Sequence, residues 1–254
     1  MKIKQIFFNN DLRNFSYLII FDDLFTICID PFQAEPIMNH LPKGRQINLI
    51  LNTHDHFDHH SGNEQLRLQF DPEIYAHQTS KITNVSRRLS DQEIIYQNEI
   101  YQLVAIESPG HTLNHLMFLL KKNQLPYALF TGDCFFNAGV GNCYNGGNVN
   151  LLYQTIKKVF STFPDELLIY PGHEYLKRNL EFTVSLEYDN HEAKNYLEKL
   201  KAKDINQDFF INDLKKEKEI NLFLRLNSKT LQQQLKQTDE EAIFIHLREL
   251  RNKW

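Results

Sequence analysis

The sequence predicts an α/β protein in which a layered α/β domain precedes an all-helical domain. Short apolar runs bounded by Asn, Asp, Gly or Pro recur over residues 1–172, as buried strands do. Residues 173–254 contain no Gly and no Pro and are rich in Leu, Glu, Lys and Gln, a composition that favours helices. We therefore expect an α/β domain over residues 1–172 and a helical domain over residues 173–254.

The strands of the first domain are expected at apolar or β-branched runs. These runs are 17–21, 24–29, 47–51, 100–106, 115–120, 127–131 and 167–170. The stretches 61–70 and 148–160 between them have the composition of helices. In the tail, apolar residues recur at helical intervals. The two clearest series are Tyr175, Leu176, Leu180, Val184, Leu186 and Ile243, Phe244, Leu247, Leu250.

The composition excludes several classes of protein. Hydrophobic residues make up 42% and charged residues 24%, which is ordinary globular usage and argues against disorder. The net charge of −4 offers no basic excess for nucleic acid, and no apolar run approaches the roughly 20 residues that a membrane-spanning helix needs. The start lacks the pattern of a secretory signal, and the three cysteines are scattered. We therefore expect a cytoplasmic protein that binds neither membrane nor nucleic acid.

A dense group of metal-binding residue types follows the expected strand 47–51. It runs from Thr53 to His59 and contains His54, His56, Asp58 and His59. In an extended segment His54 and His56 point to one side, and Asp58 and His59 can face a second point in the following turn. Imidazole and carboxylate ligands suit zinc, iron or manganese, and four ligands in six residues suggest two metals. The alternative is an adventitious histidine cluster, which this spacing directly after a strand disfavours.

Three further segments place one metal-competent residue just past the end of an expected strand. The residues are His111, Asp133 and His173, and each lies beside a glycine that permits a tight turn. Ligands delivered from strand-end loops of one sheet can converge on a common point. Alone, each segment could be an ordinary turn, but together with the first segment they complete a plausible ligand set.

These segments resemble the ordered motifs of the metallo-β-lactamase fold superfamily. The matching segments are Thr53–His59, Pro109–Thr112, Thr131–Asp133 and Pro171–Tyr175. The tail narrows the resemblance, because Gly172–Tyr175, Asn221–Arg225 and Lys229–Thr230 resemble hydroxyacylglutathione hydrolases (glyoxalase II). The resemblance implies a four-layered αββα sandwich with a C-terminal all-helical domain that binds substrate.

The resemblance also implies a site with two divalent metal ions, most commonly zinc, with iron or manganese as alternatives. One metal would be held by His54, His56 and His111, the other by Asp58, His59 and His173, and Asp133 would bridge both. Asp58 would also orient the nucleophile, and Thr53 would support the ligands from behind. His60, His77 and His115 have no role in the family pattern, and we expect them to be ordinary surface or core histidines.

The resemblance implies hydrolysis of S-D-lactoylglutathione and related 2-hydroxyacyl glutathione thioesters, the second step of methylglyoxal detoxification. We expect the enzyme to act on this small molecule as a monomer. The substrate-binding residues implied are Asn142, Tyr144, Tyr175, Arg225 and Lys229. Asn142 stands where relatives place Lys or Arg. Arg225 and Lys229 are four apart, so on one helix they would share a face and could bind one carboxylate.

Four alternatives remain at this stage. A class B β-lactamase would have no use for the helical tail, and a ribonuclease Z-like nuclease would favour a basic surface. A persulfide dioxygenase uses mononuclear iron and would not need Asp58 and His173 as ligands. A silent metal-binding module would not need an open site with seven intact ligands. The first three would act on a different substrate with the same α/β domain.

Overall fold

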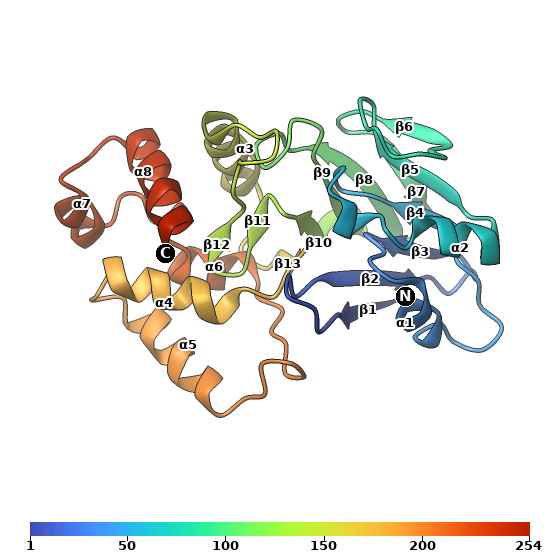
Figure 1. Ribbon diagram of the computed structural model, residues 1–254, viewed down its shortest axis with the longest axis horizontal. Coiled ribbons are helices and arrows are strands. Elements are labelled where there is room, and N and C mark those ends of the chain that lie inside the picture. The colour runs from blue at the N-terminus through green and yellow to red at the C-terminus, as the bar shows by residue number, and fades with distance from the viewer.

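The computed structural model describes residues 1–254 and contains two β-sheets packed face to face between layers of helices (Figure 1). The first sheet has six strands in the order in which they occur along the chain, antiparallel from β1 to β3 and parallel from β3 to β6. Its strands are β1 (Lys2–Phe7), β2 (Phe15–Ile20), β3 (Thr26–Ile29), β4 (Leu49–Leu51), β5 (Glu73–His77) and β6 (Arg87–Leu89).

The second sheet has five strands in the order β13-β10-β9-β8-β7, and only the pair β10 and β13 is parallel. Its strands are β7 (Ile94–Gln97), β8 (Tyr101–Glu107), β9 (Leu116–Lys122), β10 (Leu125–Gly132) and β13 (Leu168–Pro171). A separate short hairpin is formed by β11 (Phe135–Phe136) and β12 (Gly139–Val140).

Helices cover the outer face of each sheet. In Figure 1, α1 and α2 lie at one end of the molecule and the C-terminal helices, yellow to red, lie at the other. The helices of the first domain are α1 (Ala34–Asn39), the 3₁₀ turn η1 (Phe57–His59), α2 (Asn63–Phe70) and α3 (Val149–Thr162). Those of the tail are α4 (Leu176–Leu186), α5 (His191–Lys201), α6 (Leu214–Ile220), the 3₁₀ turn η2 (Leu222–Leu224), α7 (Lys229–Leu235) and α8 (Glu240–Lys253).

Strand alternation explains why the sheets are buried on both faces. In β2, Phe15, Tyr17 and Ile19 point into the apolar layer between the sheets. Leu18 and Ile20 point to the other face, where they pack with α1 and α2. On the outer face of the second sheet, side chains of β8 to β10 and β13 pack with α3 and the tail helices. The αββα layering expected from the resemblance is therefore confirmed.

All seven strands expected from the sequence are present, but the other six strands were missed. Strands β1, β6 and β7 lie at sheet edges and are only partly buried. An edge strand pairs on one side and can carry charged residues, so it gives no clear apolar run. The interior strand β5 has only three apolar residues, between Glu73 and His77, and β11 and β12 have two residues each.

The tail is helical as expected, and the domain boundary at residue 172 stays a prediction. One apolar cluster joins the two parts, because Leu129 and Ile169 of the second sheet belong to the same cluster as Phe223 and Leu247 of the tail. The tail helices therefore complete the fourth layer of the sandwich. No helix of the structure is both long and apolar enough to cross a membrane.

A buried carboxylate fixes the hairpin β11–β12 to the tail. Glu217 on α6 is fully buried, and its Oε2 accepts a hydrogen bond from the backbone N–H of Ala138 at 2.8 Å. Its Oε1 accepts a second from Asn212 Nδ2 at 2.6 Å, and Asn221 Nδ2 donates to Oε2 at 3.2 Å. Ala138 has a positive φ of 58°, so this contact holds a turn that a non-glycine residue rarely adopts.

Candidate metal centre

The local fold after β4 explains how neighbouring residues face two different points. Asp55 turns away from its histidine neighbours, because its carboxylate accepts hydrogen bonds from Ser80 Oγ, the backbone N–H of Lys81 and Asn114 Nδ2. His54 and His56 therefore lie on one side of the segment, as expected. The chain then turns through η1, which carries Asp58 and His59.

The first group of ligand atoms comprises His54, His56, His111 and Asp133, whose nitrogen or oxygen atoms all lie within 4.8 Å of one another. His54 Nε2 and His111 Nε2 lie 2.9 Å and 3.0 Å from His56 Nδ1. All but His56 are buried. These are the residues that the resemblance assigns to the first metal together with the bridge.

The second group comprises Asp58, His59 and His173, again within 4.8 Å of one another. The Nε2 atoms of His59 and His173 face each other at 3.2 Å. Asp133 contacts members of both groups, since its Oδ1 lies 3.3 Å from His59 Nε2 and its Oδ2 lies 3.5 Å from His111 Nε2. We call these seven residues the His/Asp cluster.

Each buried histidine of the His/Asp cluster uses its second ring nitrogen to donate a hydrogen bond outward. His59 Nδ1 donates to Asp30 Oδ2 at 2.9 Å, and His54 Nδ1 donates to Thr53 Oγ1 at 2.9 Å. His111 Nδ1 and His173 Nδ1 donate to the carbonyl oxygens of Asn142 and Leu12 at 2.6 Å and 2.7 Å. The remaining lone pair of each ring then points inward, which is the arrangement of metal-ligating histidines.

The donor set fits divalent metal. Imidazole lone pairs that face each other at about 3 Å repel one another unless a proton or a cation lies between them. Asp133 Oδ1 is buried without a hydrogen-bond partner, although nearly all buried polar atoms in proteins have one. A cation between these atoms satisfies both conditions.

Burial keeps two histidines of the cluster in the neutral form that binds metal. Burial, assisted by neighbouring imidazoles, holds the pKa of His54 well below its ordinary value. Burial likewise lowers the pKa of His111 to about 4. Burial alone would raise the pKa of Asp133, but the imidazoles of His173 and His59 hold it well below its ordinary value. Burial acts to lower the pKa of His59 as well, but the carboxylates of Asp133 and Asp30 outweigh it and hold that pKa well above its ordinary value. His54 and His111 thus offer neutral imidazoles, and Asp133 offers an ionised carboxylate.

The glycines beside the ligands serve two different purposes. Gly110 and Gly132 have positive φ angles of 156° and 48°, as expected for tight turns. Gly172 does not: a Cβ atom there would lie only 2.4 Å from Asp133 Oδ1. The missing side chain of Gly172 therefore makes room for the Asp133 carboxylate.

Two residues that support the cluster, Asp30 and Asn14, were missed by sequence analysis. Asp30 accepts hydrogen bonds from His59 and from the backbone N–H and hydroxyl of Thr53. Asn14 Nδ2 donates to Asp58 Oδ2 at 2.8 Å. His115 is a core histidine as expected, yet it stacks on His54 and its Nε2 accepts from the backbone N–H of Asp133 at 3.2 Å. Asp30 directly follows the expected strand 24–29, the same signal that identified the ligands.

A cavity of about 340 Å³ opens beside the cluster. Tyr175 lines it and stacks on the ring of His173, with centroids 5.1 Å apart and planes 2° apart. Asn142 and Tyr144 line it as well, so three of the five expected substrate residues are together. We call it the arginine cavity; its lining residues are Asp11, Leu12, Phe136, Val140, Asn142, Tyr144, Tyr175, Arg178, Asn179, Arg248, Arg251 and Asn252.

The cations of this cavity are Arg178, Arg248 and Arg251, which sequence analysis missed. Arg248 is buried and donates to the carbonyl oxygen of Val140 at 2.6 Å, and Arg251 donates to Asn179 Oδ1 at 3.1 Å. No carboxylate pairs with any of the three. Burial, together with the nearby Arg251, lowers the pKa of Arg248 to about 10, so it stays charged at neutral pH. The cavity therefore carries uncompensated positive charge suited to an anionic ligand.

The expectation that Arg225 and Lys229 share one helical face is wrong, and neither residue lines the arginine cavity. Arg225 follows η2, whereas α7 begins only at Lys229. The guanidinium of Arg225 forms two hydrogen bonds, of 2.7 Å and 2.8 Å, with the buried carboxylate of Glu187. Lys229 lines a separate shallow hollow with polar residues of α7. The intervening turn, invisible in the spacing, separates the two side chains.

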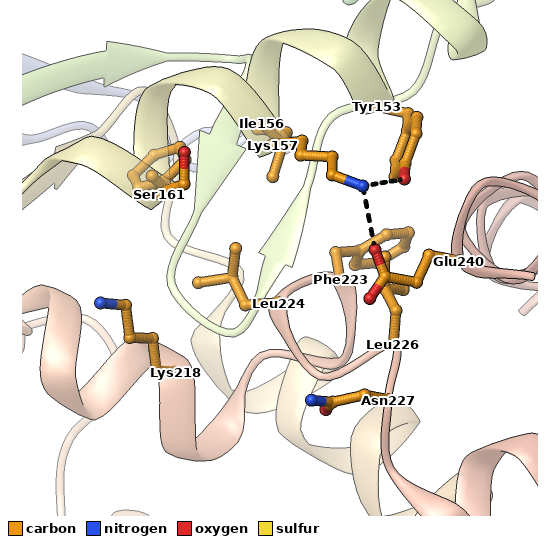
Figure 2. A pocket seen from close by; sticks show the side chains of 11 residues that line it. Tyr153, Ile156, Lys157, Ser161, Lys218, Phe223, Leu224, Leu226, Asn227 and Glu240 are labelled. Carbon is orange, nitrogen blue, oxygen red and sulfur yellow. Dashed lines mark hydrogen bonds and ion pairs between the residues drawn. The ribbon is translucent and has the colours of Figure 1, made fainter.

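A second cavity of about 350 Å³ lies between α3 and η2 and contains no residue of the His/Asp cluster. Six of its eleven lining residues are hydrophobic. Figure 2 shows Lys157 over this surface, bonded to Tyr153 and paired with Glu240 at 3.1 Å. Its other lysine, Lys218, pairs with Asp165 at 2.7 Å. Because both ammonium groups are already neutralised, this cavity is the poorer site for an anion.

Comparisons with known proteins agree with this geometry. The family model described as hydroxyacylglutathione hydrolase C-terminus matches residues 174–254, and the metallo-beta-lactamase superfamily model matches residues 10–89. The chain is 39% identical to the hydroxyacylglutathione hydrolase of Nitrosococcus oceani and 37% identical to that of Polaromonas, each over 100% of both chains. It is 30% identical to that of Dictyostelium discoideum over 89% of this chain and 86% of the relative.

Solved structures show the same fold at lower identity. ETHE1 from Myxococcus xanthus has a TM-score of 0.69 at 22% identity and covers 98% of this chain and 90% of its own. A metallo-beta-lactamase from Staphylococcus aureus has a TM-score of 0.67 at 21% identity, covering 98% of this chain and 72% of its own. Fold, motif order and full-length similarity together place this chain in the hydroxyacylglutathione hydrolase family of the metallo-β-lactamase superfamily.

Proposed function

We propose that this enzyme hydrolyses S-D-lactoylglutathione and related 2-hydroxyacyl glutathione thioesters, giving glutathione and the free hydroxy acid, D-lactate in the first case. One observation carries the proposal: a His/Asp cluster of two ligand groups adjoins a cavity with three unpaired arginines, and Tyr175 and Asn142 of that cavity contact His173 and His111 of the cluster. A glutathione thioester has a reactive carbonyl for the cluster and carboxylates for the arginines.

The residues of the cluster would hold two divalent metal ions, zinc by preference, with iron or manganese as alternatives. His54, His56 and His111 would hold one, Asp58, His59 and His173 the other, and Asp133, which contacts both groups, would bridge them. When bound, the metals would lower the pKa of water to near 7 and polarise the thioester carbonyl.

The chain's own residues would then position the reactants. Asp58, held by Asn14 at 2.8 Å, would orient the attacking water. The ring of Tyr175, stacked on His173, would line the path of the thioester from the cavity to the cluster. The leaving group is a thiolate, which needs little help from an acid. No separate general acid is therefore required.

Apart from the ligand His173 at its start, the tail would serve substrate binding rather than hydrolysis. Arg248 and Arg251 come from α8, and Tyr175 and Arg178 come from the start of α4. With Asn142 and Tyr144 from the loop after β12, they would bind the anionic thioester. This supports a division into a catalytic domain, residues 1–172, and a substrate-binding domain, residues 173–254.

The proposed enzyme is a cytoplasmic monomer that acts on a small molecule and binds neither nucleic acid nor membrane. The net charge of −4 supports the absence of nucleic acid as a partner. The three cysteines, Cys28, Cys134 and Cys143, form no disulfide, which suits a reducing compartment.

The test is a substrate panel on metal-replete enzyme. S-D-lactoylglutathione, the β-lactam nitrocefin, a small RNA and a glutathione persulfide are each supplied under one condition, and the product of each is measured. We expect efficient hydrolysis of the thioester alone. Turnover of the persulfide or of nitrocefin without thioester hydrolysis would overturn the proposal.

A further inference from the structure

The arginine cavity contains one acid among its cations. Asp11 lies in the turn between β1 and β2, and Arg178 lies on α4. Both side chains are exposed, and neither forms a hydrogen bond or an ion pair within the protein. An acid and a base that share a cavity without pairing are available to a ligand that carries both charges.

The turn that carries Asp11 is fixed in place. The carbonyl oxygen of the next residue, Leu12, accepts the hydrogen bond from His173 Nδ1 at 2.7 Å. Asn10 closes the turn, because its carbonyl accepts from the backbone N–H of Arg13 at 3.0 Å and its Oδ1 accepts from that of Asn14 at 3.1 Å. Asp11 is therefore held at the rim of the cavity, one residue from a contact with the cluster.

Arg178 is directed to the same cavity by helix geometry. Residues three apart share a helical face, and Tyr175 precedes Arg178 by three at the start of α4. Arg178 also lies near Arg251, since burial and then Arg178 lower the pKa of Arg251. Arg248 and Arg251 are tied to Val140 and Asn179, whereas Arg178 keeps all its donors for a ligand.

We propose that Asp11 and Arg178 form a subsite for the amino-acid end of the γ-glutamyl group, which rests on the proposed function. Asp11 accepts a hydrogen bond from the α-ammonium group, and Arg178 donates to the α-carboxylate beside it. Arg248 and Arg251 remain for the glycine carboxylate at the other end of the tripeptide. The cavity then matches all three charges of glutathione and selects γ-glutamyl thioesters over shorter ones.

The test uses three D-lactoyl thioesters with the same leaving sulfur. They are the thioesters of glutathione, of glutaryl-cysteinylglycine, which lacks only the α-amino group, and of N-acetyl-cysteinylglycine, whose blocked amine prevents migration of the acyl group from sulfur to nitrogen. The variants are Asp11→Asn and Arg178→Gln. Their matched controls are Asp71→Asn, an exposed acid on the far side of the first sheet, and Lys177→Gln, the exposed neighbour of Arg178 that lies outside the cavity.

We expect Asp11→Asn to raise KM for the glutathione thioester about threefold to fivefold, the size of an exposed ion pair, with kcat unchanged. The glutaryl thioester has already lost the ammonium group, so its KM stays the same in Asp11→Asn. Arg178→Gln raises KM for both of these substrates. Neither variant changes KM for the N-acetyl-cysteinylglycine thioester, and the controls behave as wild type.

Two results would overturn the subsite. One is an equal rise in KM for all three substrates in Asp11→Asn, and the other is no rise for the glutathione thioester in either variant. Failure of the proposed function looks different, because wild-type enzyme would then hydrolyse none of the three thioesters.

Discussion

The His/Asp cluster and the arginine cavity adjoin each other, yet they are assembled in different ways. Four of the seven cluster residues lie between His54 and His59, and the others follow strand ends. The cavity draws two or three residues each from the β1–β2 turn, the hairpin, the loop after β12, the start of α4 and α8. Chemistry that depends on neighbouring residues is visible in a sequence, whereas a surface assembled from distant helices is not.

The largest effect should come from breaking the contact between the two ligand groups. Asp133→Asn removes a carboxylate charge that touches both groups. Loss of even an outer partner of a metal ligand lowers metal affinity or activity about 10- to 100-fold, so we expect a loss of thioesterase rate well above about 100-fold. The metal content of the variant, measured by metal analysis, should fall below the value of about two ions per chain that we expect for wild type. A wild-type stoichiometry firmly at one, with full activity, would contradict the dinuclear mechanism.

Arg225→Ala tests whether Arg225 binds substrate, as its sequence spacing from Lys229 suggested, or stabilises the fold. Glu187 is only 2% exposed, and removal of Arg225 leaves its carboxylate unpaired in the interior. Because Arg225 itself is 30% exposed, we expect a loss of about 2–3 kcal/mol in the free energy of unfolding, the lower end for a broken buried pair. Urea unfolding measures this, with Lys229→Ala as a nearly neutral control. A raised KM with unchanged stability would restore Arg225 to the substrate site.

Arg248→Met tests the cavity itself. A charge-assisted hydrogen bond contributes about 1.5–3 kcal/mol, so its loss should raise KM for the glutathione thioester about 10- to 100-fold. We expect kcat and metal content to stay close to wild type, because Arg248 contacts no residue of the cluster. The KM of Arg248→Lys should lie between those of wild type and Arg248→Met, since lysine keeps the charge but loses the fork geometry of the guanidinium group. An equal fall in kcat and metal content would show that the two regions do not function separately.

The smallest effect is the pH dependence of stability that comes from Glu217, the buried carboxylate that fixes the hairpin β11–β12. Burial raises the pKa of Glu217 to about 7, against its hydrogen bonds from Asn212 and Ala138. A carboxyl with a raised pKa contributes stability that is complete below its unfolded pKa of about 4.3 and is lost as pH rises through 7. Between pH 5 and pH 7, wild type should therefore lose up to about 1.4 kcal/mol per pH unit relative to Glu217→Gln. Unfolding curves at each pH measure the difference.

The contrast also shows how far the sequence could predict the site. The segment from His54 to His59 predicts two facing groups because strand alternation and one turn determine where its side chains point. The helical nature of the tail was equally clear from its composition. The contribution of Arg248 depends instead on how α8 packs against α3 and η2, which no spacing within α8 records. For Arg225 the assumption of one continuous helix failed at the break between η2 and α7.

The hydrogen bond between His111 Nδ1 and the Asn142 carbonyl oxygen, 2.6 Å long, joins the two regions in one step. A metal ion that fixes the His111 ring also fixes the loop that carries Asn142 and Tyr144. Such coupling is reciprocal: if metal raises the affinity for the thioester by some factor, bound thioester raises the affinity for metal by the same factor. Enzyme supplied with substrate should therefore lose its metal to a chelator more slowly than enzyme without substrate. The amount of metal that the enzyme keeps then depends on how much thioester is bound to it.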